Sequence, residues 1–246
     1  MDHLQEQHKS ICGEKFTSYD STEKKLQEIK QALHTDFYRP EEHPSPLGDS
    51  KMYNPAVEIM DDYFTYSDEG WVAESELMWI LSHVPEYIPS EDIITYLSSI
   101  DKILEIGAGN GYWSHVINMN GGNCIPTDLY PREINENIDN YPVTEGIVNS
   151  ESITIWSDVI KKKHTHIKEF SGDAVLICHP EGLEWTEEIL EFIDKNQKLI
   201  VVAEWYPGPD STPFFFKNLH ENFTLLEKYS VLNWDYSDVC CYIFQK

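Results

Sequence analysis

The apolar residues of this chain fall into short runs that alternate with amphipathic stretches from residue 102 to the C-terminus. The runs are short, apolar and bounded by turn residues, as buried strands are. They predict strands at 102–106, 123–129, 152–156, 173–178, 198–205, 224–232 and 238–244. The stretches between them predict helices at 111–120, 132–139, 158–168, 186–195 and 213–222. This alternation predicts a parallel sheet covered by helices on both faces.

The last two predicted strands are separated only by residues 233–237. That connection is too short for a helical crossover, so the two strands should form an antiparallel hairpin. We therefore expect an α/β fold with a mostly parallel seven-stranded sheet and an antiparallel strand at the C-terminal end.

The N-terminal third has helical periodicity without strands. Helices are expected at 20–37, 55–65, 71–84 and 90–99, with a proline-rich connector at 39–49. Ser90 is the expected N-cap of the last helix, and Glu91 and Asp92 suit the positive end of its dipole. We divide the chain into a helical extension, residues 1–87, and an α/β domain, residues 88–246.

A glycine-rich turn follows the strand Ile103–Ile106. Gly107, Gly109 and Gly111 alternate there, and a helix begins near Tyr112. Alternating glycines let the backbone turn sharply and approach a ligand, and the helix directs free N–H groups at it. A plain tight turn would need only one glycine. Because position 112 is Tyr, the spacing is G-x-G-x-G and not the G-x-G-x-x-G of NAD-binding folds.

The sequence E-I-G-A-G-N-G, residues 105–111, resembles motif I of the class I S-adenosylmethionine (SAM) methyltransferases. The stretches YIPSEDIITYL, GAGNGYW and FFFKNL are similar to a little-characterised group of methyltransferase-like proteins. The resemblance covers roughly residues 88–246. It implies a Rossmann-like sheet, SAM as cofactor, and a floor under the methionine part of SAM formed by Gly107, Ala108, Gly109 and Gly111.

The same resemblance assigns further cofactor contacts. Glu105 would contact the amino group of SAM, and Asp128, which ends the second predicted strand, would accept the ribose hydroxyls. Leu129 would pack on the adenine ring, and Asp158 would reach the adenine amine. Each acid also has a structural alternative. Glu105 can cap nearby N–H groups, Asp128 can form a turn, and Asp158 can be a helix N-cap.

The loop after the fourth predicted strand carries the candidate catalytic groups, His179 and Glu181. Either can act as a general base. The loop reads H-P-E-G and departs from the D/N-P-P-Y/F of enzymes that methylate amino groups of bases or glutamine. A loop without chemistry is the alternative. Four aromatic residues are candidates for a wall of the acceptor pocket: Tyr112, Trp113, Trp205 and Tyr206. Packing in the core is the alternative for Trp113.

The composition excludes several classes of function. A net charge of −25 and a pI near 4.6 argue against a nucleic-acid partner. The sequence contains no apolar run of the ~18–20 residues that cross a bilayer. A polar N-terminus and an odd number of cysteines, five, fit a cytoplasmic protein with free thiols. Neither H-E-x-x-H nor a paired C-x-x-C occurs, so no metal site is expected.

These features favour a SAM-dependent methyltransferase acting on a small-molecule or protein acceptor. The H-P-E-G loop keeps a non-catalytic SAM-binding interaction module as an alternative. An NAD-dependent oxidoreductase is disfavoured by Tyr112 at the position of the third glycine of its fingerprint.

Overall fold

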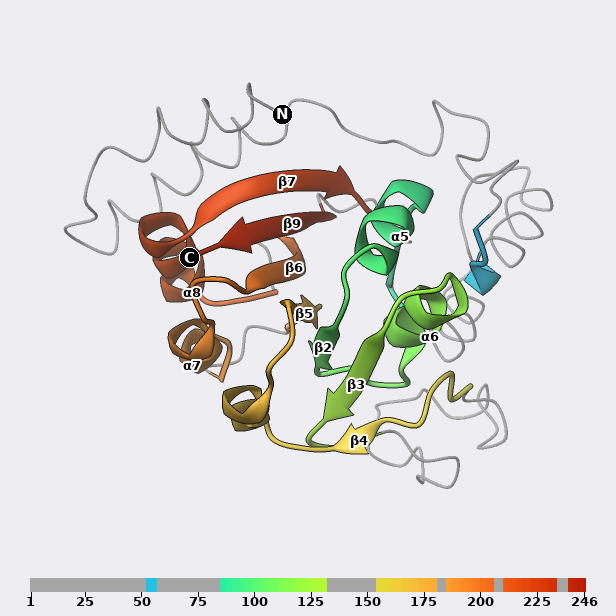
Figure 1. The fold of residues 1–246 in the computed structure, drawn as a ribbon. Helices are drawn as coiled ribbons and strands as arrows, with labels where there is room; N and C mark the ends of the chain where they lie inside the picture. The colour runs from blue at the N-terminus through green and yellow to red at the C-terminus, as the bar shows by residue number, and fades with distance from the viewer. Residues whose placement is uncertain (1–51, 57–84, 132–153, 181–184, 206–209, 234–238) are drawn as a thin grey trace, which may run out of the picture.

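The computed structural model describes residues 52–56, 85–131, 154–180, 185–205, 210–233 and 239–246 (Figure 1). The predicted helices at 20–37, 71–84 and 132–139, and most of the one at 55–65, lie outside these ranges. The helices are α5 (Glu91–Ser98), α6 (Tyr112–Met119), α7 (Trp185–Phe192), α8 (Pro213–Asn222) and the 3-10 helix η3 (His164–Glu169). The strands are β1 (Tyr87–Ile88), β2 (Ile103–Ile106), β3 (Cys124–Asp128), β4 (Ile160–Lys161), β5 (Ala174–Cys178), β6 (Lys198–Glu204), β7 (Thr224–Ser230), β8 (Leu232–Asn233) and β9 (Val239–Gln245).

Seven strands form one twisted sheet in the order β4-β3-β2-β5-β6-β9-β7 (Figure 1). Strands β2 to β6 pair in parallel, and β9 pairs antiparallel with both β6 and β7. The predicted fold class, a Rossmann-like and mostly parallel sheet closed by an antiparallel C-terminal strand, is confirmed. The predicted hairpin is the β7–β9 pair.

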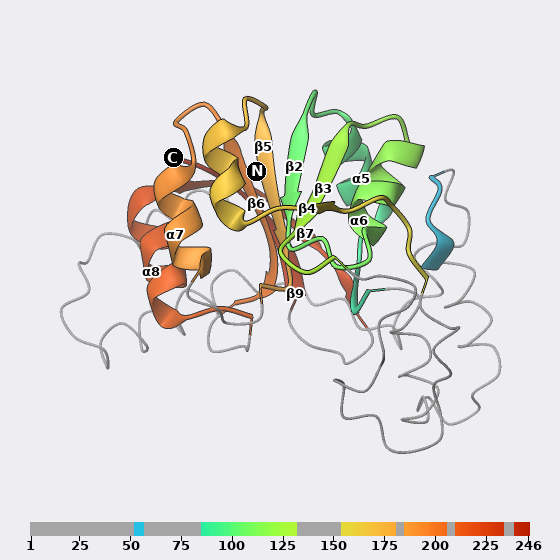
Figure 2. The same cartoon turned by 90° about the horizontal axis from the view of Figure 1, so that it is seen from below.

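The sheet is covered on both faces, with α5 and α6 on one side and α7 and α8 on the other (Figure 2). Alternate residues of each strand face opposite layers. Ile103 and Leu176 belong to the core under α5 and α6, whereas Leu104 and Val175 belong to the core under α7 and α8. Central strands buried on both faces are mostly apolar, which explains why the sequence predicts them.

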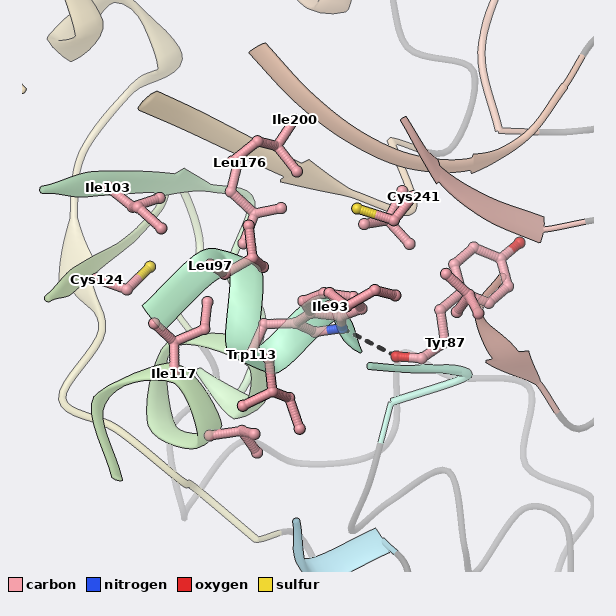
Figure 3. Close-up of a cluster of buried hydrophobic side chains, with 14 of the residues drawn as sticks. Tyr87, Ile93, Leu97, Ile103, Trp113, Ile117, Cys124, Leu176, Ile200 and Cys241 are labelled. Atoms are coloured by element: carbon pink, nitrogen blue, oxygen red, sulfur yellow. Dashed lines mark hydrogen bonds between the residues drawn. The ribbon is translucent and has the colours of Figure 1, made fainter. Parts of the chain in front are cut away.

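A second sheet pairs β1 with β8 and was not predicted. Tyr87 lies opposite Asn233 in it. The Trp113 indole N–H donates to the Tyr87 carbonyl at 2.9 Å, and both side chains lie in the core under α5 and α6 (Figure 3). This contact ties the segment before α5 to the first turn of α6.

The third strand and the helix after it were wrongly predicted. The apolar alternation at 152–156 suggested a strand, but residues 154–159 have no regular structure and the strand is β4, at 160–161. The helix expected at 158–168 is the shorter η3. Strand β4 is exposed and pairs with β3 alone, so its position depends on that pairing and not on an apolar pattern.

Helix α8 begins with a side-chain cap. The Thr212 hydroxyl accepts the Phe215 N–H at 3.1 Å, and Pro213 occupies the first helical position. We expect Thr212→Ala to lower the free energy of unfolding by about 1 kcal/mol. Urea unfolding measures this, with Ser90→Ala as the matched control, because Ser90 is the N-cap of α5 but makes no side-chain cap bond. Equal losses in the two variants would contradict the capping role.

Candidate functional site

The glycine turn joins β2 to α6 at the carboxyl edge of the sheet. Its three glycines have positive φ angles of 75°, 55° and 78°, which only glycine adopts without strain. The N–H groups of Gly107 and Ala108 donate to the Thr127 carbonyl at 2.9 and 3.1 Å, so the turn is fixed to β3. Gly111 is the N-cap of α6 and, as a glycine, has no side chain to cap that helix.

The three glycines differ in the space beside them. A Cβ at Gly107 would lie 3.8 Å from the Trp185 ring, and one at Gly111 would clash with Ser157 at 2.8 Å. A Cβ at Gly109 would meet nothing within 4 Å among the described residues. Gly109 is therefore the point at which a ligand can approach the backbone of the turn.

Asp128 places its carboxylate against this open point. One oxygen accepts the Gly109 N–H at 2.9 Å, and the other accepts the Tyr130 N–H at 2.7 Å. The bond to the Tyr130 N–H forms the local turn that was the alternative role of Asp128. The bond to the Gly109 N–H brings the carboxylate to the glycine turn, where the ribose-binding role requires it. Leu129 is 40% exposed beside it, so an apolar surface is present for a flat ring to pack on.

Glu105 lies buried beneath the turn. Its carboxylate accepts the Ser114 N–H at 3.1 Å and the Ser114 hydroxyl, so it bonds to the first turns of α6. Burial raises the pKa of Glu105 to about 7 and outweighs the two Ser114 hydrogen bonds, which lower it. Glu105 thus caps the Ser114 N–H, as its alternative role predicts. Only Ile106 separates Glu105 from the first glycine of the turn.

Asp158 is not at the carboxyl end of a strand, where it was expected. It is exposed and precedes β4. The neighbouring Ser157 contacts Gly111, and the Trp156 N–H donates to the Asn110 carbonyl at 2.9 Å. The backbone before Asp158 therefore lies on the glycine turn, and its role toward adenine stays a prediction.

His179, at the end of β5, lies between two carboxylates. Its Nε2 is 3.3 Å from Asp210 and its Nδ1 is 3.4 Å from Glu86. The ring stacks on Tyr87 with centroids 4.8 Å apart. The φ angle of His179 is 51°, which costs a non-glycine residue strain of the kind found at functional sites. Glu181, the other candidate base, lies outside the described residues.

Asp210 is fully buried in this cluster. It accepts the Tyr87 hydroxyl with both oxygens, at 3.1 and 3.0 Å, and also the Glu204 N–H. Burial raises the pKa of Asp210, whereas the Glu204 N–H and His179 act against that rise. Burial also raises the pKa of Tyr87 far above its ordinary value, with the charge of Asp210 adding to it. The four residues Glu86, Tyr87, His179 and Asp210 are referred to below as the His179 cluster.

The His179 cluster and the glycine turn share one edge of the sheet. Strands β2, β5 and β6 are neighbours, and their carboxyl ends carry the turn, His179 and Glu204. The pKa of the Cys178 thiol responds to the charges of both groups. Burial raises its pKa well above the usual value, and the charges of Glu105, Asp210 and Glu86 raise it further.

The sequence did not indicate Glu86, Tyr87 or Asp210 as site residues. Asp210 lies in the loop after β6, and loops at strand carboxyl ends are the general place for such groups, which is the one signal that was available. Glu86 and Tyr87 reach the site through the unpredicted β1–β8 sheet.

The aromatic wall was wrongly predicted. Tyr112, Trp113 and Trp205 are at most 2% exposed. Trp205 packs between Phe216 and Tyr242, with ring centroids 4.8 and 5.3 Å away. These side chains fill the core because each helix and strand must bury its apolar face. Tyr206 lies outside the described residues.

No group of three or more His, Cys, Asp or Glu side chains is arranged to hold a metal ion within the ranges that the structure describes. A search of the same ranges finds no helix long and apolar enough to cross a membrane.

No protein-family model matches the sequence, and no curated protein matches it. Solved structures do resemble it. A Streptococcus mutans protein described as a SAM-dependent methyltransferase aligns at 11% identity and a TM-score of 0.41, over 72% of this chain and 50% of its own. The N-methyltransferase NodS from Bradyrhizobium japonicum aligns at 13% and 0.38, over 62% and 91%. MtNAS, in complex with MTA and tNA, aligns at 13% and 0.40, over 100% and 97%.

This chain spans about half the length of the Streptococcus mutans protein. The TM-scores of these three structures lie below 0.5. The fold class therefore rests on the strand order of this chain.

Proposed function

We propose that this chain is a SAM-dependent methyltransferase whose acceptor is a small molecule or a protein. The observation that carries the proposal is the open face of Gly109 with the Asp128 carboxylate beside it. A nucleoside ligand needs both features, a backbone it can approach closely and an acid for its ribose. The bound cofactor would supply a methyl group on a sulfonium, which is released by in-line displacement.

The residues of this chain would then have separate tasks. Gly107 to Gly111 would support the methionine part of SAM, with Ala108 inside the turn and Glu105 below it. Asp128 and Leu129 would hold the adenosine, and Asp158 would lie next to the adenine. Catalysis would rest on proximity and alignment, with His179 or Glu181 as a base where the acceptor must lose a proton.

Residues 1–87 are proposed to shape the acceptor pocket or cover the cofactor. Their described segment supports this role, because the Ala56 N–H donates to the Tyr112 hydroxyl at 3.0 Å. Tyr112 is the first residue of α6, next to the glycine turn.

Transfer of labelled methyl groups tests the function. The full chain would be incubated with methyl-labelled SAM and an extract of small molecules and proteins, and labelled products would be separated. We expect labelled product with the wild type and none with Gly109→Val. Binding of SAM without any labelled product would instead support the non-catalytic interaction module.

Asp128→Ala should weaken SAM binding by roughly 10- to 100-fold, because a charge-assisted hydrogen bond to the ribose is lost. The SAM affinity of Asp128→Asn should lie between that of the wild type and that of Asp128→Ala, because the amide oxygen can still accept the Gly109 N–H. Calorimetric titration measures both. Asp173→Ala is the control, because Asp173 is an exposed acid at the opposite edge of the sheet, before β5. Equal affinity in Asp128→Ala and the wild type would remove Asp128 from the site.

A further inference from the structure

The ring of His179 is held on three sides. Tyr87 stacks on its face, Asp210 lies 3.3 Å from Nε2, and Glu86 lies 3.4 Å from Nδ1. A histidine with one nitrogen on a buried carboxylate has a fixed ring orientation and a fixed tautomer.

Asp210 and Glu86 differ in burial. The Asp210 side chain is 0% exposed, and its oxygens accept the Tyr87 hydroxyl and the Glu204 N–H. The Glu86 side chain is 30% exposed, similar to the 32% of His179. Asp210 is thus the fixed acceptor, because a buried carboxylate bonded to other groups cannot turn away. This arrangement favours the His179 proton on Nε2, facing Asp210, with the lone pair on Nδ1, on the side of the partly exposed Glu86.

We propose that Asp210 is the positioning residue of His179, which it holds with Nδ1 ready to take a proton from the acceptor as the methyl group is transferred. This inference rests on the proposed function and adds to it both the orienting carboxylate and the nitrogen that acts. In the step, the acceptor nucleophile forms a bond to the methyl carbon and the carbon–sulfur bond breaks, with its electron pair going to sulfur. The proton of the nucleophile moves to His179 Nδ1.

The surroundings of His179 also restrict the acceptor. Asp210 and Glu86 flank the ring, and Glu204 lies close enough for its charge to raise the pKa of Asp210. The two carboxylates that flank the imidazole give this site negative charge, which attracts a cationic acceptor and repels an anionic one. The acceptor class that fits is an amine, whose cationic form must give up a proton before its nitrogen lone pair can attack the methyl group.

The tautomer of His179 tests the positioning role without any acceptor. Ring nitrogens of the full chain, labelled with 15N-histidine, would be observed by NMR in alkaline solution, and His179→Gln would assign the signal. We expect the proton on Nε2 in the wild type. In Asp210→Asn the side-chain amide can donate to Nε2, and we expect the proton to move to Nδ1, as happens when the triad aspartate of serine proteases is replaced by asparagine.

A matched control is available in the same protein. His166 Nδ1 lies 3.2 Å from Glu169, an exposed residue of η3. Glu169→Gln should leave the His179 signal unchanged. A proton on Nδ1 of His179 in the wild type would overturn the proposal. This result comes from the wild type alone, so it does not depend on whether the variants fold. The same tautomer in the wild type and in folded Asp210→Asn would overturn it as well.

Methyl transfer gives a second readout. With labelled SAM and a mixture of amines, His179→Gln and Asp210→Asn should each lower the rate by at least ~100-fold. The Kd for SAM should change less than about twofold, since proton transfer and not cofactor binding is affected. An unchanged rate in Asp210→Asn would overturn the positioning role. Failure of the wild type to bind SAM would remove the proposed function, whereas the tautomer would still decide whether Asp210 orients His179.

Discussion

Gly109→Val is expected to abolish detectable SAM binding in a chain that still folds. A Cβ at this position meets no described atom within 4 Å, so we expect the substitution to leave the core intact. It would occupy the space that the ligand needs, and a β-branched residue at a φ of 55° also strains the turn. We expect a loss of at least ~100-fold in affinity, about 3 kcal/mol of binding free energy.

Gly121→Val separates these two effects. Gly121 has a φ of 89°, and a Cβ there would also meet nothing within 4 Å of the described residues, but it follows the C-terminus of α6. Both variants should lose similar stability from backbone strain, of order 1–3 kcal/mol. Only Gly109→Val should lose SAM. Calorimetric titration and thermal unfolding of both variants check this. Equal loss of binding in the two would show that strain, and not blocked space, is responsible.

Glu105→Gln is expected to stabilise the protein above neutral pH and to have little effect in acid. The pKa of Glu105 is raised from 4.5 to about 7, so folding favours its protonated form. The stability that this protonated carboxyl contributes is complete below about pH 4.5 and is lost as the pH rises through about 7. The shift in the Glu105 pKa sets an upper limit of about 3 kcal/mol on the difference in unfolding free energy between Glu105→Gln and the wild type at pH 8.

Glutamine keeps an oxygen that can accept the Ser114 N–H and hydroxyl, so the local bonds survive. Urea unfolding of the wild type and the variant at pH 5 and pH 8 measures the difference. The exposed Glu191 provides the control, because Glu191→Gln removes a charge without removing a buried one. A Glu105→Gln chain that is less stable than the wild type at pH 8 would contradict the raised pKa.

Cofactor binding offers a second test of Glu105. If the SAM ammonium interacts with this carboxylate, binding near pH 6 must release a proton from the wild type. Titrations in buffers of different ionisation enthalpy measure that release. Glu105→Gln should bind SAM without releasing a proton. If the wild type also releases no proton, Glu105 has only the role of capping α6.

The central strands could be predicted from the sequence because their environment is uniform. The inner residues of β5 and β6 are buried on both faces of the sheet and are apolar, so the runs stand out in the sequence. Strand β4 could not be predicted in this way. It is a two-residue edge strand with both residues exposed, and only its pairing with β3 defines it.

The two parts of the candidate site differ in the same respect. The residues of the glycine turn are consecutive in the sequence. The turn requires positive φ angles, and glycine occupies each position that adopts one: Gly107, Gly109 and Gly111. The His179 cluster joins residues 86, 179 and 210, which meet only after the β1–β8 sheet and the loop beyond β6 are in place. No local pattern encodes such a meeting. The aromatic wall failed for a related reason, because sequence alone cannot separate an aromatic residue of a pocket from one of the core.

Calorimetric titration of the full chain with SAM, S-adenosylhomocysteine and NAD measures directly which nucleotide this chain binds. We expect one molecule of either sulfur ligand to bind, with a Kd between roughly 1 µM and 1 mM, and NAD not to bind. Binding of NAD without binding of SAM or S-adenosylhomocysteine, or heat from none of the three, would refute the assignment of SAM as the cofactor.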